Sequence, residues 1–128
     1  MTIYKLALIA ALILPAGAAL ADGDAAAGAK VFKKCAACHT ATEPNNKVGP
    51  SLMGVVGRPV ASVEDYKYSK AMKAFGADGM VWSEEELTDY LPNPRGLVKG
   101  TTMAFAGLKK DEDIANVIAY LKDPSAAQ

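Results

Sequence analysis

Two cysteines and the only histidine of the chain lie close together in the stretch KKCAACHT, residues 33–40. On an α-helix Cys35 and Cys38 occupy positions i and i+3 and His39 occupies i+4, so all three side chains share one face. A flat macrocycle could be bonded there through both sulfurs, with the imidazole reaching a metal at its centre. CxxCH is the attachment motif of c-type haem, in which each thiol adds to a vinyl group and the histidine becomes an axial iron ligand. The motif therefore favours covalently bound haem.

Three other interpretations of these residues remain open. Structural zinc normally takes four Cys or His ligands, and the chain has three such residues, so a carboxylate would have to complete the set. A thioredoxin-like dithiol is expected within a βαβ unit, and the chain shows no strand pattern. A plain disulfide would leave the adjacent histidine without a role. Haem is the working hypothesis.

A second axial ligand cannot be another histidine, because His39 is the only one. The remaining choices are methionine, lysine, a small ligand or an open position. A methionine within a helix, as expected for Met72, is more often core filler than a ligand. Met103 lies in the loop segment GTTMAFAG, which is placed between two predicted helices and could wrap the far side of a macrocycle. The residues alone leave two alternatives for the second axial ligand, Met103 or one of the other three methionines of the predicted domain: Met53, Met72 and Met80.

Both ends of the predicted domain show helical periodicity. The segment DAAAGAKVFKKCAACH follows Asp24, a favourable N-cap residue, and predicts a helix that carries the CxxCH motif. The segment DEDIANVIAYLKDP predicts a second helix with acidic residues in its first turn and Pro124 after its end. Its apolar residues recur at helical spacing and form one face: Ile114, Val117, Ile118 and Leu121. We expect the two terminal helices to pack on each other.

The middle of the chain predicts short helices separated by loops. A capping box at Ser83 predicts a helix that Pro92 and Pro94 end, and a further short helix is expected from Ser69 to a cap at Gly76. The remaining segments are rich in Gly, Pro and Asn and lack the alternation typical of strands. Long loops in so small a domain must pack against something, and a large prosthetic group would provide that surface.

The N-terminus has the features of a cleavable secretory signal. Lys5 precedes an apolar run over residues 6–14, and small residues follow up to Ala21. The run is too short to cross a bilayer comfortably, and Pro15 interrupts it. We predict cleavage after Ala21, which leaves one domain at residues 22–128; an uncleaved N-terminal anchor is the alternative.

The charge and hydropathy of the chain limit which kinds of partner are expected. The chain has 14 basic and 14 acidic side chains and a formal net charge of zero. Binding to nucleic acid wants a net basic surface, so nucleic acid is not an expected partner. No second apolar stretch is long enough to cross a membrane. We therefore expect a soluble, exported protein without stable membrane insertion, located in the periplasm.

Taken in order, the motifs resemble those of class I cytochromes c, and in particular the small soluble bacterial members of that family. The resemblance runs from about Gly28 to Leu121. It rests on GAKVFKKCAACH, VGPSLMGVVGR, YKYSKAM, the tryptophan at 82, YLPNP, KGTTMAFAGLKK and IANVIAYL. It implies an all-α fold, in which the terminal helices pack on each other and loops wrap around one covalently bound haem c.

The resemblance also implies roles for individual residues. Cys35 and Cys38 would form the haem thioethers, His39 would be the proximal iron ligand with its ring N–H on the Pro50 carbonyl, and Met103 would be the distal ligand. Tyr90 would lie beneath the methionine sulfur and Phe105 beside the haem edge. A further group would lie on the propionate side: Arg58, Tyr66, Tyr68 and Trp82. The contact between terminal helices would involve Gly28, Phe32 and Tyr120.

A cytochrome of this type is expected to be a monomeric one-electron carrier rather than an enzyme. It would shuttle between membrane redox complexes, from a cytochrome bc complex to an oxidase or a photosynthetic reaction centre. The alternative is a haem enzyme or gas-binding protein with an open sixth coordination site. Docking would use a cationic face around the exposed haem edge. Its expected members are Lys34, Lys47, Arg95, Lys99, Lys109 and Lys110, while acidic residues at helix starts would face elsewhere.

Overall fold

The computed structural model describes residues 23–128. The predicted signal peptide and its cleavage after Ala21 lie outside these residues and stay predictions. The described residues form helices and loops, with one isolated β-bridge between Pro59 and Val81 and no sheet. The elements are α1 (Ala25–Phe32), α2 (Lys70–Phe75), α3 (Glu84–Tyr90), α4 (Pro94–Leu97), α5 (Asp111–Lys122) and a final 3₁₀ turn, η1 (Pro124–Ala127). Within the described part of the chain no helix is long and apolar enough to span a membrane.

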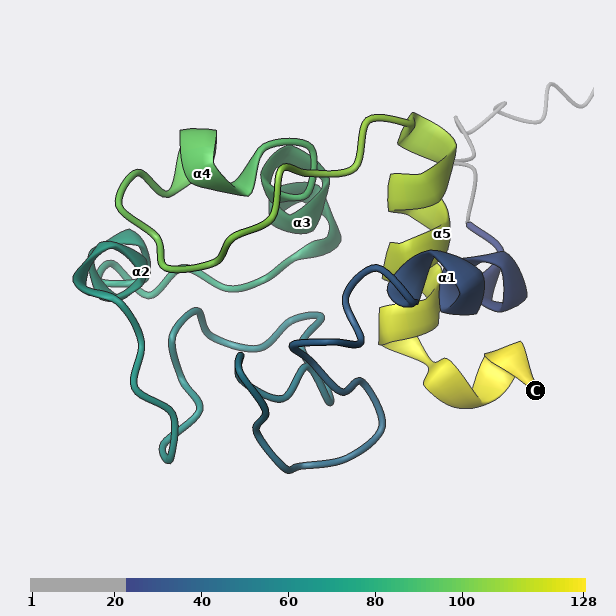
Figure 1. The fold of residues 1–128 in the computed structure, drawn as a ribbon, viewed down its shortest axis with the longest axis horizontal. Coiled ribbons are helices and arrows are strands. Elements are labelled where there is room, and N and C mark those ends of the chain that lie inside the picture. The colour runs from purple at the N-terminus through teal and green to yellow at the C-terminus, as the bar shows by residue number, and fades with distance from the viewer. Residues whose placement is uncertain (1–22) are drawn as a thin grey trace, which may run out of the picture.

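The terminal helices α1 and α5 cross in close contact, as Figure 1 shows. Gly28 makes the crossing possible, because a Cβ atom at this position would lie 1.9 Å from the carbonyl oxygen of Asn116 and 2.8 Å from the Cβ of Tyr120. Beside it, the rings of Phe32 and Tyr120 pack with centroids 5.3 Å apart. The predicted packing of the two terminal helices is confirmed.

The same pair of helices is joined by polar contacts at the start of α1. The Asp24 carboxylate caps α1 by accepting from the backbone N–H of Ala26 at 2.8 Å. The backbone N–H of Asp24 in turn donates to Oδ1 of Asn116 on α5, at 2.8 Å. Asn116 is buried, so this bond satisfies a polar group that would otherwise be costly to place in the core.

The first helix is shorter than the sequence predicts. It ends at Phe32, and residues 33–38 form hydrogen-bonded turns instead of continuing the helix. The carbonyl oxygen of Cys35 accepts from the backbone N–H of both Cys38, at 3.1 Å, and His39, at 2.9 Å. These i→i+3 and i→i+4 bonds keep the local helical spacing of the CxxCH motif although the regular helix has ended.

Two of the short middle helices begin where their caps predict. Ser69 caps α2 by accepting from the backbone N–H of Met72, and Ser83 caps α3 in the same way. The prediction for Pro94 is wrong: this proline does not end a helix but opens α4, where Asn93 is the N-cap. Proline is favoured at the first helical position because its fixed φ suits the helix and the missing N–H would be unpaired there. Figure 1 shows α2 and α4 at the other end of the molecule from the α1–α5 pair, with α3 between α4 and α5.

Candidate haem site

Loops and helices enclose a cavity of about 410 Å³, which falls within the usual range for small-molecule and cofactor sites. Residues from α1, α2, α3 and α5 and from the loops between them line it, including the loop before α5. All the residues predicted to hold haem are among the lining residues: Cys35, Cys38, His39, Pro50, Arg58, Tyr66, Tyr68, Trp82, Tyr90, Met103 and Phe105. The fold therefore brings together side chains that are up to 70 positions apart in the sequence.

The imidazole of His39 is fixed by the segment that follows the CxxCH motif. Its Nδ1 lies 2.8 Å from the carbonyl oxygen of Pro50, and since a carbonyl can only accept, Nδ1 carries the proton. Burial lowers the pKa of His39, which favours the neutral ring. Gly49 allows this close packing, because a Cβ there would lie 2.3 Å from Cε1 of the imidazole. The lone pair of Nε2 is left free, which is the form that binds a metal.

The sulfur of Met103 also has a defined partner. The hydroxyl of Tyr90, at the end of α3, lies 3.1 Å from the Sδ atom and donates to it. Tyr90 is only 5% exposed, and burial raises its pKa to about 12, so the hydroxyl stays protonated at neutral pH. Its ring packs against Trp82 with centroids 4.7 Å apart. A thioether held by one donor keeps a second lone pair available for a soft metal.

The cavity distinguishes between the four candidate methionines, because only two of them line it. Met53 and Met80 do not line it, and Met53 is 45% exposed. Met72, on α2, lines the cavity together with Met103, although the sequence favoured it as core filler. Of the two, Met103 is the one whose sulfur is held by a hydrogen bond.

A buried nitrogen of Arg58 shows whether an acidic group would fit the cavity. Among the described residues, Nε of Arg58 is the buried side-chain nitrogen or oxygen without a hydrogen-bond partner. The same side chain donates through Nη1 to the backbone oxygens of Ser51, at 2.9 Å, and Met53, at 3.1 Å. A buried guanidinium N–H at the cavity is costly unless an acceptor reaches it, and a carboxylate is its best partner. Haem carries two propionate groups, so the residues present fit haem.

Two tyrosines lie on the same lining and brace the neighbouring loops. The hydroxyl of Tyr66 donates to the carbonyl oxygen of Val48 at 3.1 Å, and the hydroxyl of Tyr68 accepts from the backbone N–H of Val63 at 3.1 Å. Their rings meet edge to face with centroids 4.9 Å apart. These bonds tie the loop before α2 to the loop after His39, with both rings on the cavity.

The cysteines bear on the other interpretations of the motif. Cys35 and Cys38 are not joined in a disulfide; Cys35 is partly buried and Cys38 is exposed. Burial raises the pKa of the Cys35 thiol, which is opposite to what an activated redox thiolate needs. No group of three or more His, Cys, Asp or Glu side chains within residues 23–128 could hold a metal ion. The described residues therefore do not offer the four ligands of structural zinc, and burial does not activate the Cys35 thiol.

Several apolar lining residues were not predicted as part of the site from the sequence. They include Leu52, Val55, Leu87, Leu91, Val117 and Leu121. The periodicity of the last helix identified Val117 and Leu121 as a buried face. It could not show that this face contacts the cavity as well as α1.

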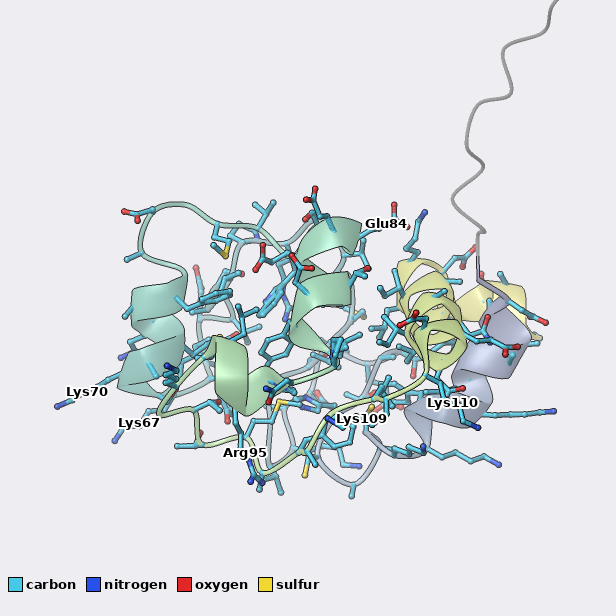
Figure 2. The ribbon with its side chains drawn as sticks, turned by 90° about the horizontal axis from the view of Figure 1, so that it is seen from above. Lys67, Lys70, Glu84, Arg95, Lys109 and Lys110 are labelled. Carbon is cyan, nitrogen blue, oxygen red and sulfur yellow. The ribbon has the colours of Figure 1, made fainter. Side chains whose placement is uncertain are left out.

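The cations predicted to dock partners are placed in different ways. Lys34 lines the cavity and Lys47 donates to the carbonyl oxygen of Ala36 in the CxxCH segment. Figure 2 shows Arg95, Lys109 and Lys110 on one side of the molecule, with Lys67 and Lys70 along the same side. Glu84 points to the opposite side, where it pairs with Lys122 at 3.0 Å.

Comparison with known proteins gives matches of sequence and of fold. Residues 25–124 match the family model described as cytochrome c. Cytochrome c2 of Afifella marina is 52% identical over 98 residues, covering 76% of this chain and 79% of the relative. Cytochrome c2 of Rhodospirillum rubrum is 45% identical over 123 residues, covering 90% and 91%. The structure of cytochrome cH from Methylobacterium extorquens superimposes with a TM-score of 0.70 at 40% identity, covering 78% of this chain and 98% of that one.

Proposed function

The chain belongs to the cytochrome c family, whose members carry covalently bound haem c, and we propose that it is a soluble periplasmic one-electron carrier. In this proposal Cys35 and Cys38 would hold the haem through thioether bonds, and His39 and Met103 would ligate its iron. The observation that carries it is that both candidate ligand side chains line one cavity and each is fixed by a hydrogen bond: Nδ1 of His39 donates to the Pro50 carbonyl, and the Met103 sulfur accepts from Tyr90.

Each of these bonds has a function in electron transfer. The haem iron supplies the redox chemistry, by taking up and releasing one electron between its ferric and ferrous states. The carbonyl of Pro50 holds His39 in the tautomer that presents Nε2 and strengthens its donation. The hydroxyl of Tyr90 orients the thioether and withdraws electron density from it. The largely apolar lining keeps water away, and a dry site with a thioether ligand favours the ferrous state. Fixed ligands also mean that little rearranges when the charge changes.

The ligand assignment is tested by replacing Met103 with alanine. The wild-type ferric protein should show the long-wavelength charge-transfer band of iron bound to methionine sulfur, and the ferrous protein should not bind CO rapidly. Met103→Ala should lose the band and bind CO. Met53→Ala is the matched control, because Met53 is exposed and does not line the cavity. If Met103→Ala keeps the band while Met72→Ala loses it, then Met72 is the ligand. Rapid CO binding by wild type would instead favour an enzyme or gas-binding protein with an open sixth site.

We propose that the side of the molecule with Arg95, Lys109 and Lys110 docks acidic surfaces of a cytochrome bc complex and of an oxidase or reaction centre. Arg95→Gln should lower the second-order rate of electron exchange severalfold at low salt, and the difference should vanish at high salt because screening removes it. Lys122→Gln is the control, since it removes the same charge next to Glu84, on the other side of the molecule. Equal effects of the two variants would exclude this face as the docking surface.

The N-terminal assignment has a direct measurement. Protein purified from the periplasm of a host with haem-attachment machinery should have the mass of residues 22–128 plus one haem. Both thiols should resist alkylation after denaturation. A colourless product with two free thiols would refute covalent attachment, and a full-length mass would favour an uncleaved anchor.

A further inference from the structure

Two adjacent lysines before α5 differ in what their side chains contact. The ammonium group of Lys109 donates to the carbonyl oxygen of Pro92 at 2.8 Å and to that of Ala106 at 3.0 Å. Within the described chain Lys110 has no hydrogen bond or ion pair through its side chain, although it too is exposed and lies at the N-cap of α5. An exposed lysine at this place in the chain need not form hydrogen bonds, as Lys110 shows, so the two bonds of Lys109 are specific to its contacts.

The bonds of Lys109 lie at the base of the loop that carries Met103. The chain leaves α3 at Leu91 and returns at Leu108, whose backbone N–H donates to the Leu91 carbonyl at 2.8 Å. Next to this bond Gly107 packs on Pro92, where a Cβ would lie 2.0 Å from the carbonyl oxygen. Figure 1 shows this returning segment passing beside α3 on its way to α5. Lys109 adds the side-chain link across the same junction.

Few other hydrogen bonds hold the last part of this loop, residues 102–107. Over residues 102–107 of the described chain, the Met103 amide donates to Oγ1 of Thr101 and its sulfur accepts from Tyr90. The only further hydrogen bond is the one from Lys109 to Ala106. A segment with so few bonds gains a large share of its order from each of them.

The end of α3 gives the ammonium group a favourable partner. The last carbonyls of a helix have no partner within it and carry partial negative charge, so a lysine is well placed there. Leu91 is the C-cap of α3 and Pro92 follows it, so the Pro92 carbonyl lies just beyond these helix carbonyls, where it accepts a hydrogen bond from Lys109. The same helix carries Tyr90, so the bond from Lys109 reaches the chain two residues after the tyrosine that contacts the Met103 sulfur.

We propose that Lys109 is a positioning residue, whose ammonium group clamps the Met103 segment to the end of α3 and so keeps the methionine on the iron. This inference rests on the proposed function, in which Met103 is the distal ligand. It gives Lys109 a role in ligand retention in addition to its place on the predicted docking side.

Three variants test the clamp in the haem-loaded protein. Lys109→Met and Lys110→Met each remove one charge and keep an apolar stem of similar length. Imidazole added to the ferric protein competes with the methionine sulfur, so its binding constant reports how firmly the segment is held. Lys109→Met should bind imidazole about three- to tenfold more tightly, as expected for one lost hydrogen-bonding group. Lys110→Met should match wild type. Lys109→Arg should recover part of the difference, because a guanidinium can still donate to both carbonyls.

Equal shifts in the two methionine variants would mean that only charge matters and would overturn the proposal, as would an unchanged constant in Lys109→Met. A measurement on wild type covers the case in which Lys109→Met fails to assemble. In ¹⁵N NMR the ammonium protons of Lys109 should exchange with water more slowly than those of Lys110, and equal rates would refute the clamp. A wild-type ferric spectrum without the methionine band would refute the ligand assignment instead, and slow ammonium exchange would then show that the link itself exists.

Discussion

Replacing Tyr90 by phenylalanine would remove one buried oxygen atom from the cavity and almost nothing else. The hydroxyl has one hydrogen-bond partner among the described residues, the sulfur of Met103 at 3.1 Å, and the ring stays packed on Trp82. Because phenylalanine has the same shape, no cavity larger than the missing oxygen forms. The variant therefore isolates the effect of the bond on the sulfur.

The direction of the change follows from the electronics of the thioether. A donated hydrogen bond withdraws electron density from the Met103 sulfur, and ferric iron loses more from this than ferrous iron does. Removing the bond should therefore stabilise the ferric state and lower the reduction potential. A net hydrogen bond is worth about 1 kcal/mol, and a tenfold change in a one-electron equilibrium corresponds to roughly 59 mV. If half or more of that energy differs between the two oxidation states, the potential should fall by about 20–40 mV.

Spectroelectrochemical titration measures this shift, and Tyr120→Phe provides the control. Tyr120 loses the same atom, but its ring packs on Phe32 between the terminal helices and does not line the cavity. Its potential should stay at the wild-type value. A potential in Tyr90→Phe that is unchanged or higher than wild type would show that the hydroxyl does not tune the iron through the sulfur. An equal fall in both variants would point to a general effect of losing a tyrosine hydroxyl.

Three further changes follow from contacts in the structure. Gly28→Ala should lower the free energy of unfolding by about 1–3 kcal/mol, because the added Cβ would lie 1.9 Å from the Asn116 carbonyl oxygen and the terminal helices must separate. Chemical denaturation measures this change. As a control, Ala26→Ser on the exposed side of α1 should change the free energy of unfolding little. Gly49→Ala should weaken imidazole ligation, visible as an altered ferrous spectrum, because the Cβ would lie 2.3 Å from Cε1 of His39; a normal spectrum would contradict the packing. Wild type should lose stability as the pH rises from 10 to 12, because burial raises the pKa of Tyr90 from 10.0 to about 12 and only the unfolded chain releases that proton below pH 12. Tyr90→Phe should lack this part of the pH dependence of stability. Identical pH profiles of the two proteins would refute the prediction.

Most of the candidate site could be predicted from the sequence because its chemistry is concentrated in rare residues. The chain has one histidine and two cysteines, and their spacing alone indicates haem. The resemblance to class I cytochromes c then supplied the more distant residues, such as Arg58 and Phe105, and all of them line the cavity. Helix positions were predicted where a cap or an apolar period marks them, as at Ser83 and in α5.

Predictions failed where short-range patterns are ambiguous. Pro94 can end one helix or begin the next, and the cap at Asn93 decided for the second. The first helix ends at Phe32 although its pattern continues into the CxxCH motif. There the backbone changes to a mixture of i→i+3 and i→i+4 hydrogen bonds, and His39 contacts Pro50, which is 11 residues further on.

The amino-acid sequence by itself determined the haem-binding motif and the pairing of the terminal helices, because these depend on residue type and on periodicity within a few turns, and its resemblance to class I cytochromes c implied the all-α class. Only the tertiary structure decided which methionine has a fixed sulfur, which guanidinium nitrogen is left for an acidic group, and which of two adjacent lysines closes the Met103 loop. Each of those depends on contacts between segments far apart in the chain, and such contacts are set by how the loops pack around the cavity.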